Sequence, residues 1–202
     1  NSDWETEGND RASLALPSNQ DKLIEKICNA NKNTVVVLNT GSPCEMPWSE
    51  NAEAILQCWF PGQEFGNSLS DILFGEVNPS GKLPTTFPHK ISDTPAYSTY
   101  PGKDLQMDYE EGLFIGYRWY DREKIKPLFP FGHGLSYTTF EYSNLRAIPP
   151  RGTSSVAAFE IDITNSGSLA GKEVVQGYIS VSNSQIDRPN KELKKFDKVF
   201  LK

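Results

Sequence analysis

The chain has 202 residues, of which 37% are hydrophobic, 23% charged and 11% aromatic, a composition that suits a globular protein with a real core and argues against disorder. The formal net charge is −6: residues 1–100 carry 13 acidic and 6 basic side chains, and residues 101–202 carry 13 and 14. An acidic first half argues against a nucleic-acid partner, because phosphate binding needs a basic face, and no run reaches the roughly 20 apolar residues of a membrane span.

The first half begins with a helix and two strand-like runs. Residues 17–33 place apolar side chains on one helical face, with Ser18 as the expected N-cap and Asp21 in the first turn. The β-branched run within 34–43 predicts a buried strand and its C-terminal loop, and residues 54–60 predict a second strand.

The next segment, 65–84, predicts a short helix followed by a turn. Gly75 is expected to end the helix, and residues 78–81, Asn-Pro-Ser-Gly, are expected to form the turn. Helix, strand, strand and helix of these lengths indicate an α/β layer with a largely parallel sheet. The apolar face of the second helix, expected to point inward, consists of Leu69, Ile72, Leu73 and Phe74.

From about residue 88 the pattern changes to a long stretch rich in aromatic residues, glycine and proline. A connection of this length without its own periodicity is usually functional or packed down. Its rings are suited to stacking on a sugar, but we favour the interpretation that they pack in the seam between domains, with Glu111 pairing with Arg118. The rings in question belong to Tyr109, Phe114, Tyr117, Trp119 and Tyr120.

After residue 141 the pattern indicates β-structure. Phe159, Ile161 and Ile163 alternate with polar residues before a turn at 165–167, and two further strand-like runs follow, EVVQGYISV and FDKVFL. Three or four strands are fewer than the seven of a complete sandwich, which needs roughly 100 residues. The β-domain is therefore expected to be incomplete, with strand edges that need covering.

Cysteine and histidine are scarce. Cys28, Cys44 and Cys58 have no metal-type spacing and lie in or beside apolar segments, so we interpret them as small buried residues. His89 and His133 are too few and too scattered for a zinc site, and His133 is expected to be structural. The absence of an N-x-S/T sequon and the odd number of cysteines lean weakly toward an intracellular location, without excluding secretion.

Six motifs follow one another along nearly the whole chain: WETEGNDR (4–11), NTVVVLNTGSP (33–43), NPSGKLPTTFP (78–88), YEEGLFIGYRWYD (109–121), PFGHGLSYTTFEYSNL (130–145) and KELKKFDKVFL (191–201). Any one of them would be weak, because loops of glycine, proline and aromatic residues are common. In this order they resemble the C-terminal half of glycoside hydrolase family 3, the β-glucosidase family. The residues of these motifs are most similar to those of yeast and filamentous-fungal members of the family.

The resemblance implies an enzyme in three parts: a barrel, then an α/β sandwich, then a fibronectin type III-like β-sandwich, with the active site between the first two. For this chain the resemblance implies an α/β fold class, in which residues 1–87 form the end of the α/β sandwich domain. Residues 88–145 would connect that domain to a truncated fibronectin type III-like β-sandwich at 146–202. The barrel and the remaining β-sandwich segments of the same enzyme are then expected partners.

The resemblance also gives a role to Glu7, the residue before Gly8 in the pattern E-G-x-D-R. The family's glutamate acid/base carries over to Glu7, whereas its aspartate nucleophile lies on the barrel, outside this chain. Glu7 would protonate the departing glycosidic oxygen and later deprotonate water. Glu5 is a carboxylate of the same type two residues earlier and is not expected to take this role. Asp10 and Arg11 are interpreted as an ion pair or a turn-fixing set that orients the loop.

The expected function is therefore that of the C-terminal part of a retaining β-glucosidase, a polysaccharide-degrading enzyme acting on a β-glucoside or oligosaccharide. No metal or organic cofactor is expected, because two carboxyl groups and water suffice. Two alternatives stay open: a non-catalytic carbohydrate-binding or interaction module on the same scaffold, and a β-xylosidase of the same family. The isolated chain is expected to be inactive, and a homo-oligomer is left open.

Overall fold

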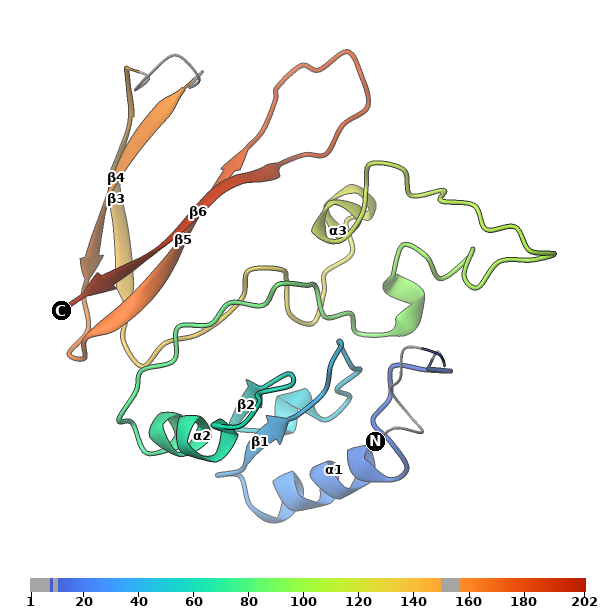
Figure 1. The fold of residues 1–202 in the computed structure, drawn as a ribbon, viewed down its shortest axis with the longest axis vertical. Helices are drawn as coiled ribbons and strands as arrows, with labels where there is room; N and C mark the ends of the chain where they lie inside the picture. Colours follow the sequence, from blue (N-terminus) through green and yellow to red (C-terminus); the bar gives the residue numbers. More distant parts are fainter. Residues whose placement is uncertain (1–7, 9–10, 150–156) are drawn as a thin grey trace. The chain divides into compact units, whose positions relative to one another are not determined.

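The computed structural model of the protein describes residues 8, 11–149 and 157–202. In chain order the elements are α1 (Gln20–Ala30), β1 (Val35–Leu38), η1 (Ser49–Asn51), β2 (Ala54–Gln57), α2 (Phe65–Leu73), η2 (Ile91–Asp93), α3 (Tyr117–Glu123), β3 (Phe140–Ile148), β4 (Ala158–Asn165), β5 (Gly171–Ile179) and β6 (Glu192–Leu201) (Figure 1). The chain divides into two compact units. Unit 1 consists of Asn1–Phe65, Leu83–His133 and Tyr178–Glu192, and unit 2 of Gly66–Lys82, Gly134–Gly177 and Leu193–Lys202.

The sheet of unit 1 is the parallel pair that the sequence predicts. β1 and β2 run parallel, in a register that places Val35 opposite Ala54 and Leu38 opposite Gln57. β2 ends at Gln57, earlier than the expected strand end at residue 60. The reason is local, because Trp59 has a φ of 53°, a left-handed value that an extended strand does not contain.

Helix α1 forms where expected but begins differently. The prediction of Ser18 as N-cap is wrong: Asn19 is at the N-cap position, and no side chain caps the helix. Ser18 has a φ of 55°, and the N–H of Gln20 bonds to the carbonyl of Pro17 at 3.2 Å. The chain therefore enters the helix through a tight turn that takes the Ser18 hydroxyl away from the capping position.

The core of unit 1 contains two of the three cysteines, Cys28 and Cys44, together with the rings of Trp48 and Phe87. Cys28 and Cys44 are fully buried and all three cysteines are free thiols, which confirms the interpretation as small buried residues for these two. Cys58 is only half-buried. Burial raises the pKa of the Cys58 thiol. His133 stacks on Phe129 with ring centroids 5.3 Å apart, which supports its expected structural role.

The second helix, α2, presents less of an inward face than the sequence predicts. Leu69 and Ile72 are half-buried, but Leu73 is 43% and Phe74 is 81% exposed, so the prediction is wrong for these two. Phe74 directly follows the last helical residue, and on a period of 3.6 it points well away from Leu69. Gly75 ends the helix as predicted, with a φ of 82°.

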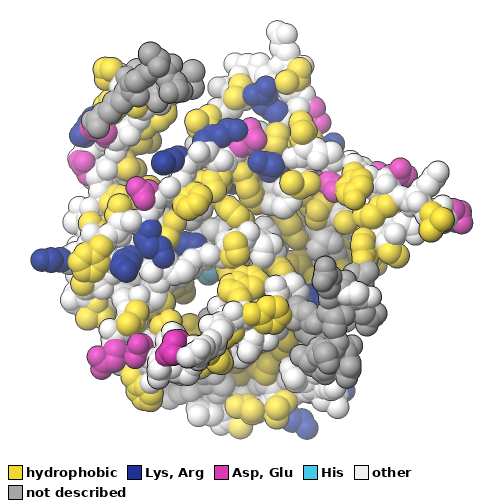
Figure 2. All heavy atoms as spheres, in the orientation of Figure 1, with side chains coloured by type: hydrophobic (Ala, Val, Ile, Leu, Met, Phe, Trp, Pro, Cys, Tyr) yellow, Lys and Arg dark blue, Asp and Glu magenta, His cyan; other side chains and the backbone are white. Residues whose placement is uncertain are grey.

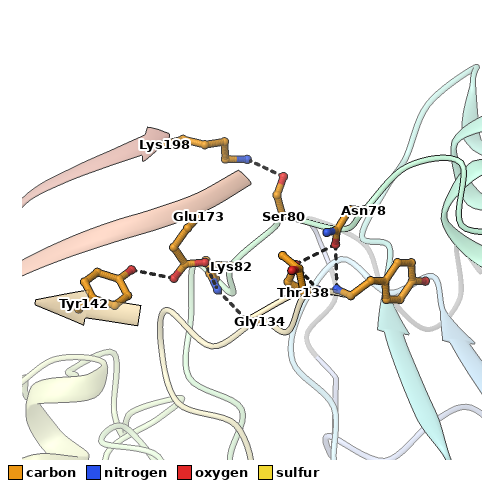
Figure 3. A network of polar contacts seen from close by, with 10 residues as sticks. Asn78, Ser80, Lys82, Gly134, Thr138, Tyr142, Glu173 and Lys198 are labelled. Carbon is orange, nitrogen blue, oxygen red and sulfur yellow. Dashed lines mark hydrogen bonds and ion pairs between the residues drawn. The ribbon is translucent and has the colours of Figure 1, made fainter. Parts of the chain in front are cut away.

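The expected turn at residues 78–81 is absent, because the side chain of Asn78 holds this part of unit 2 in an irregular, turn-free path. Its Oδ1 accepts hydrogen bonds from Ser136 Oγ and from the N–H of Tyr137, both at 2.8 Å (Figure 3). Its Nδ2 donates to the carbonyl of Ala170 at 3.1 Å. Partners 58 to 92 residues away in sequence thus replace the local bonds of a turn.

Two further strand pairs lie within the described residues from Phe140 onward. β3 and β4 are antiparallel, with an irregularity between Ser143 and Arg146, where Asn144 has a φ of 54°. β5 and β6 are hydrogen-bonded neighbours. Along β4 the expected alternation is seen from Ile161 onward: Ile161 and Ile163 are half-buried, whereas Asp162 and Thr164 are exposed. It fails at Phe159, which is 58% exposed.

Apolar side chains also reach the surface. Figure 2 shows hydrophobic side chains spread among charged ones over the visible face. Leu105 is fully exposed and Leu135 is 78% exposed. Within the described residues, no helix is both long and apolar enough to cross a membrane.

Candidate active site

The sequence-predicted acid/base, Glu7, lies outside the described residues, as do Glu5 and Asp10. The expected ion pair between Asp10 and Arg11 therefore stays a prediction. Gly8 is exposed, and a Cβ added to it would meet no described atom within 4 Å. From Arg11 onward, the structure describes how the segment that follows Glu7 is held.

This segment is hydrogen-bonded to the β1 loop, which we define as residues 39–48, the chain that leaves the carboxyl end of β1. Arg11 Nη2 donates to the carbonyl of Pro43 at 2.7 Å. The N–H of Glu45 donates to the carbonyl of Leu14 at 2.8 Å. Because a guanidinium forms charge-assisted bonds, which are stronger than neutral ones, the Arg11 contact is the firmer of the two anchors.

Asp21, in the first turn of α1, ties the same two segments together. Its Oδ2 accepts the N–H of Leu16 at 3.1 Å, and its Oδ1 accepts the indole N–H of Trp48 at 2.7 Å. Trp48 is 1% exposed and Leu16 is 5% exposed, and both pack in the core of unit 1. A buried indole N–H needs a partner, and Asp21 supplies it.

Polar side chains also meet at the carboxyl ends of β1 and β2. Gln57 Nε2 donates to both the carbonyl and the hydroxyl of Thr40, at 3.0 and 3.1 Å. The Thr40 hydroxyl in turn donates to the carbonyl of Ser42 at 3.0 Å. In α/β folds, ligands bind outside the carboxyl ends of the strands, and the segment that follows Glu7 is anchored to the loop that begins there.

The aromatic residues of the connecting stretch divide between packing and exposure. Phe114 and Tyr120 are each 6% exposed, and the ring centroids of Tyr117 and Phe131 are 5.2 Å apart. These rings therefore pack within unit 1. Tyr109 is 73% exposed, and for this ring the packing interpretation is wrong. It precedes the buried Phe114 by a turn that carries it into solvent.

The expected pairing of Glu111 with Arg118 is also wrong. Arg118, on α3, pairs with Glu192 instead, at 3.4 Å between Nη2 and Oε1. The helix that contains Arg118 was not predicted, and it directs this side chain toward residue 192 rather than toward the preceding loop. Burial, followed by the nearby charge of Asp93, raises the pKa of Tyr120 to about 12.

Sequence reasoning missed two residues of this region. It noted Asp21 only as a first-turn acid, although its partner Trp48 lies 27 residues away. It counted Gln57 within an apolar strand, where a single polar side chain is itself a signal, because buried polar groups require partners. Within the described parts of the chain, no cluster of three His, Cys, Asp or Glu side chains is arranged to hold a metal ion.

Comparison with known proteins gives matches along the whole chain. Residues 1–137 match the glycosyl hydrolase family 3 C-terminal domain, and residues 173–202 match the fibronectin type III-like domain. The thermostable beta-glucosidase B of Acetivibrio thermocellus is 50% identical over 201 residues, which is 98% of this chain and 26% of the relative. A putative beta-glucosidase of Schizosaccharomyces pombe is 47% identical, over 98% of this chain and 24% of the relative.

Solved structures agree with these relatives. A beta-glucosidase from Kluyveromyces marxianus superimposes with a TM-score of 0.92 at 44% identity, over 100% of this chain and 24% of its own. A beta-glucosidase from Streptomyces venezuelae, solved with D-glucose, gives a TM-score of 0.91 at 45% identity, over 97% of this chain and 25% of its own. The chain thus spans about a quarter of the length of the proteins it matches, and it has the predicted fold: an α/β part followed by a fibronectin type III-like part.

Proposed function

Because the chain belongs to glycoside hydrolase family 3, we propose that it is the C-terminal part of a retaining β-glucosidase that hydrolyses terminal non-reducing β-D-glucosyl residues. One observation carries the proposal: relatives named beta-glucosidase match 98% of the chain at up to 50% identity. Since the chain spans about a quarter of those relatives, the aspartate nucleophile and most sugar-binding residues would come from further sequence of the same enzyme.

In this function Glu7 is the general acid/base. It first protonates the glycosidic oxygen while the barrel's aspartate attacks the anomeric carbon, and it then removes a proton from the water that releases the glycosyl-enzyme. The first step needs a protonated carboxyl group, which burial or the nucleophile's negative charge provides by raising its pKa. The anchoring of the segment after Glu7 to the β1 loop is consistent with a catalytic residue held on a loop.

The proposal is tested by the stereochemistry of hydrolysis. The full-length enzyme should release β-glucose first from an aryl β-glucoside, with α-glucose appearing only through mutarotation, because two displacements at one carbon retain its configuration. Proton NMR during the first minutes measures this. α-Glucose as the first product would contradict a retaining mechanism, and faster turnover of the aryl β-xyloside would favour a β-xylosidase. No turnover of any β-glycoside would favour the binding module.

The isolated polypeptide 1–202 should not turn over the same substrate above the buffer rate, because the proposed nucleophile for the first displacement lies on the barrel. The measurement compares release of the aryl group by equal molar amounts of this polypeptide and of the full-length enzyme. Turnover by the polypeptide alone would require a second catalytic carboxyl group within these 202 residues and would contradict the assignment of the nucleophile to the barrel.

A further inference from the structure

We propose that Asp21 is a positioning residue for catalysis, which holds the segment that follows the acid/base against the β1 loop; this inference rests on the proposed role of Glu7. Asp21 uses both carboxylate oxygens. One accepts the N–H of Leu16, and the other accepts the indole N–H of Trp48, at 3.1 and 2.7 Å. One side chain on α1 therefore fixes both the segment after Arg11 and the end of the β1 loop.

The chemistry of the two partners explains why this position needs a carboxylate. Both are N–H donors, so both oxygens of residue 21 must accept. An asparagine would turn its NH₂ group toward one of the two donors and would lose that bond. Because Trp48 is 1% exposed, its indole N–H has no access to water as a substitute partner.

Two further hydrogen bonds connect the β1 loop to the segment that follows Glu7, so the loss of the Asp21 anchor should affect the position of that segment. The β1 loop also accepts the Arg11 guanidinium at Pro43 and donates to the carbonyl of Leu14 from Glu45. Arg11 follows Glu7 by only four residues in the sequence. We therefore expect a shift of the Asp21 anchor to move Arg11 and, through this short connection, Glu7. A displacement of about 1 Å at a reacting group costs up to about 100-fold in rate.

The test compares Asp21→Asn with Glu25→Gln in the full-length enzyme. Glu25 is an exposed carboxylate one turn further along α1, so its amide variant makes the same change of charge on the same helix without touching the anchor. Each variant is assayed on phenyl β-glucoside, whose leaving group needs a proton, and on 2,4-dinitrophenyl β-glucoside, whose leaving group needs almost none.

A misplaced acid/base should lower kcat/KM for the phenyl glucoside by about 10- to 100-fold and that for the dinitrophenyl glucoside by less than about 3-fold. Glu25→Gln should leave both unchanged. In a Trp48→Phe background, where the indole donor is gone, Asp21→Asn can keep its oxygen on Leu16, and its effect on the phenyl glucoside should shrink to a few-fold.

Several outcomes overturn the inference. Equal losses on both substrates would mean that Asp21 only maintains the fold, and an Asp21→Asn variant as active as Glu25→Gln would mean that it positions nothing. If Asp21→Asn does not fold, Trp48→Phe alone removes one of the two bonds and should give the same substrate-selective loss, or the inference fails. A parent enzyme without β-glycosidase activity removes the proposed function as well, whereas an active parent with an unselective Asp21 variant removes only the positioning role.

Discussion

Replacement of Glu7 by alanine in the full-length enzyme should lower kcat on 2,4-dinitrophenyl β-glucoside by about 10²- to 10⁴-fold, and added azide should restore a large part of it. The good leaving group departs without a proton, so the glycosyl-enzyme still forms. Its hydrolysis is slow because no base activates water. Azide is anionic and needs no base, so it should release the sugar as β-glucosyl azide, which NMR identifies together with the rate.

The matched control is Glu5→Ala, which removes a carboxylate of the same kind two residues earlier and should leave kcat unchanged. Full activity in Glu7→Ala would move the acid/base role to Glu5 or to another carboxylate. Formation of α-glucosyl azide would contradict the assignment in another way, because it would indicate that azide enters from the face occupied by the nucleophile.

Local patterns in the sequence predict those parts of the fold that local forces determine. The apolar spacing of residues 20–30 and the β-branched run beginning near Val35 predict α1 and β1, because a period of 3.6 is typical of a helix and a β-branched run of a strand. The burial of the helical face is only partial, since Cys28 is buried but Leu23 and Ile27 are 57% and 46% exposed. Gly75 ends α2 as predicted because its φ of 82° is open to glycine at little cost. The assignment of Glu7, by contrast, came from family resemblance and had no basis in local physics.

Tertiary partners were not predictable, because nothing in the local sequence encodes them. Arg118 has an acidic residue, Glu111, only seven positions earlier in the sequence, yet it pairs with Glu192, 74 positions away. In the sequence, nothing distinguishes Asp21 from any other acidic residue in the first turn of a helix. Only the fold brings the indole of Trp48 to it. Patterns of period 2 and 3.6 predict elements and faces, whereas the anchors of the candidate site depend on which loops meet.

In unit 2, loss of the ion pair between Lys82 and Glu173 should open the surrounding structure. Lys82 Nζ lies 3.1 Å from Glu173 Oε2, and the two side chains are only 16% and 13% exposed. The same Nζ donates to the carbonyl of Gly134 at 2.6 Å, and Tyr142 donates its hydroxyl to Glu173 at 2.9 Å (Figure 3). Burial, the hydrogen bond to Glu173 and its charge raise the pKa of Tyr142, so the phenol remains a donor at neutral pH.

Lys82→Met leaves the carboxylate of Glu173 with Tyr142 alone, and breaking a largely buried pair in this way costs about 3 kcal/mol, or about 100-fold in the equilibrium for local opening. Hydrogen exchange of the full-length enzyme, followed by mass spectrometry on peptides that cover residues 78–82 and 171–177, should show this loss of protection. Glu173→Gln should cost less, because the amide oxygen still accepts from Lys82.

The exposed pair of Arg146 and Glu160 is the matched control within unit 2. Its side chains are 53% and 38% exposed at an Nη2 to Oε2 distance of 2.9 Å, so Glu160→Gln should change protection by less than about 1 kcal/mol. The double variant Lys82→Met with Glu173→Leu should recover most of the protection, because the cost arises from a charge left buried without its partner. If the double variant is as open as Lys82→Met alone, the pair acts through geometry at Gly134 and Tyr142 rather than through charge.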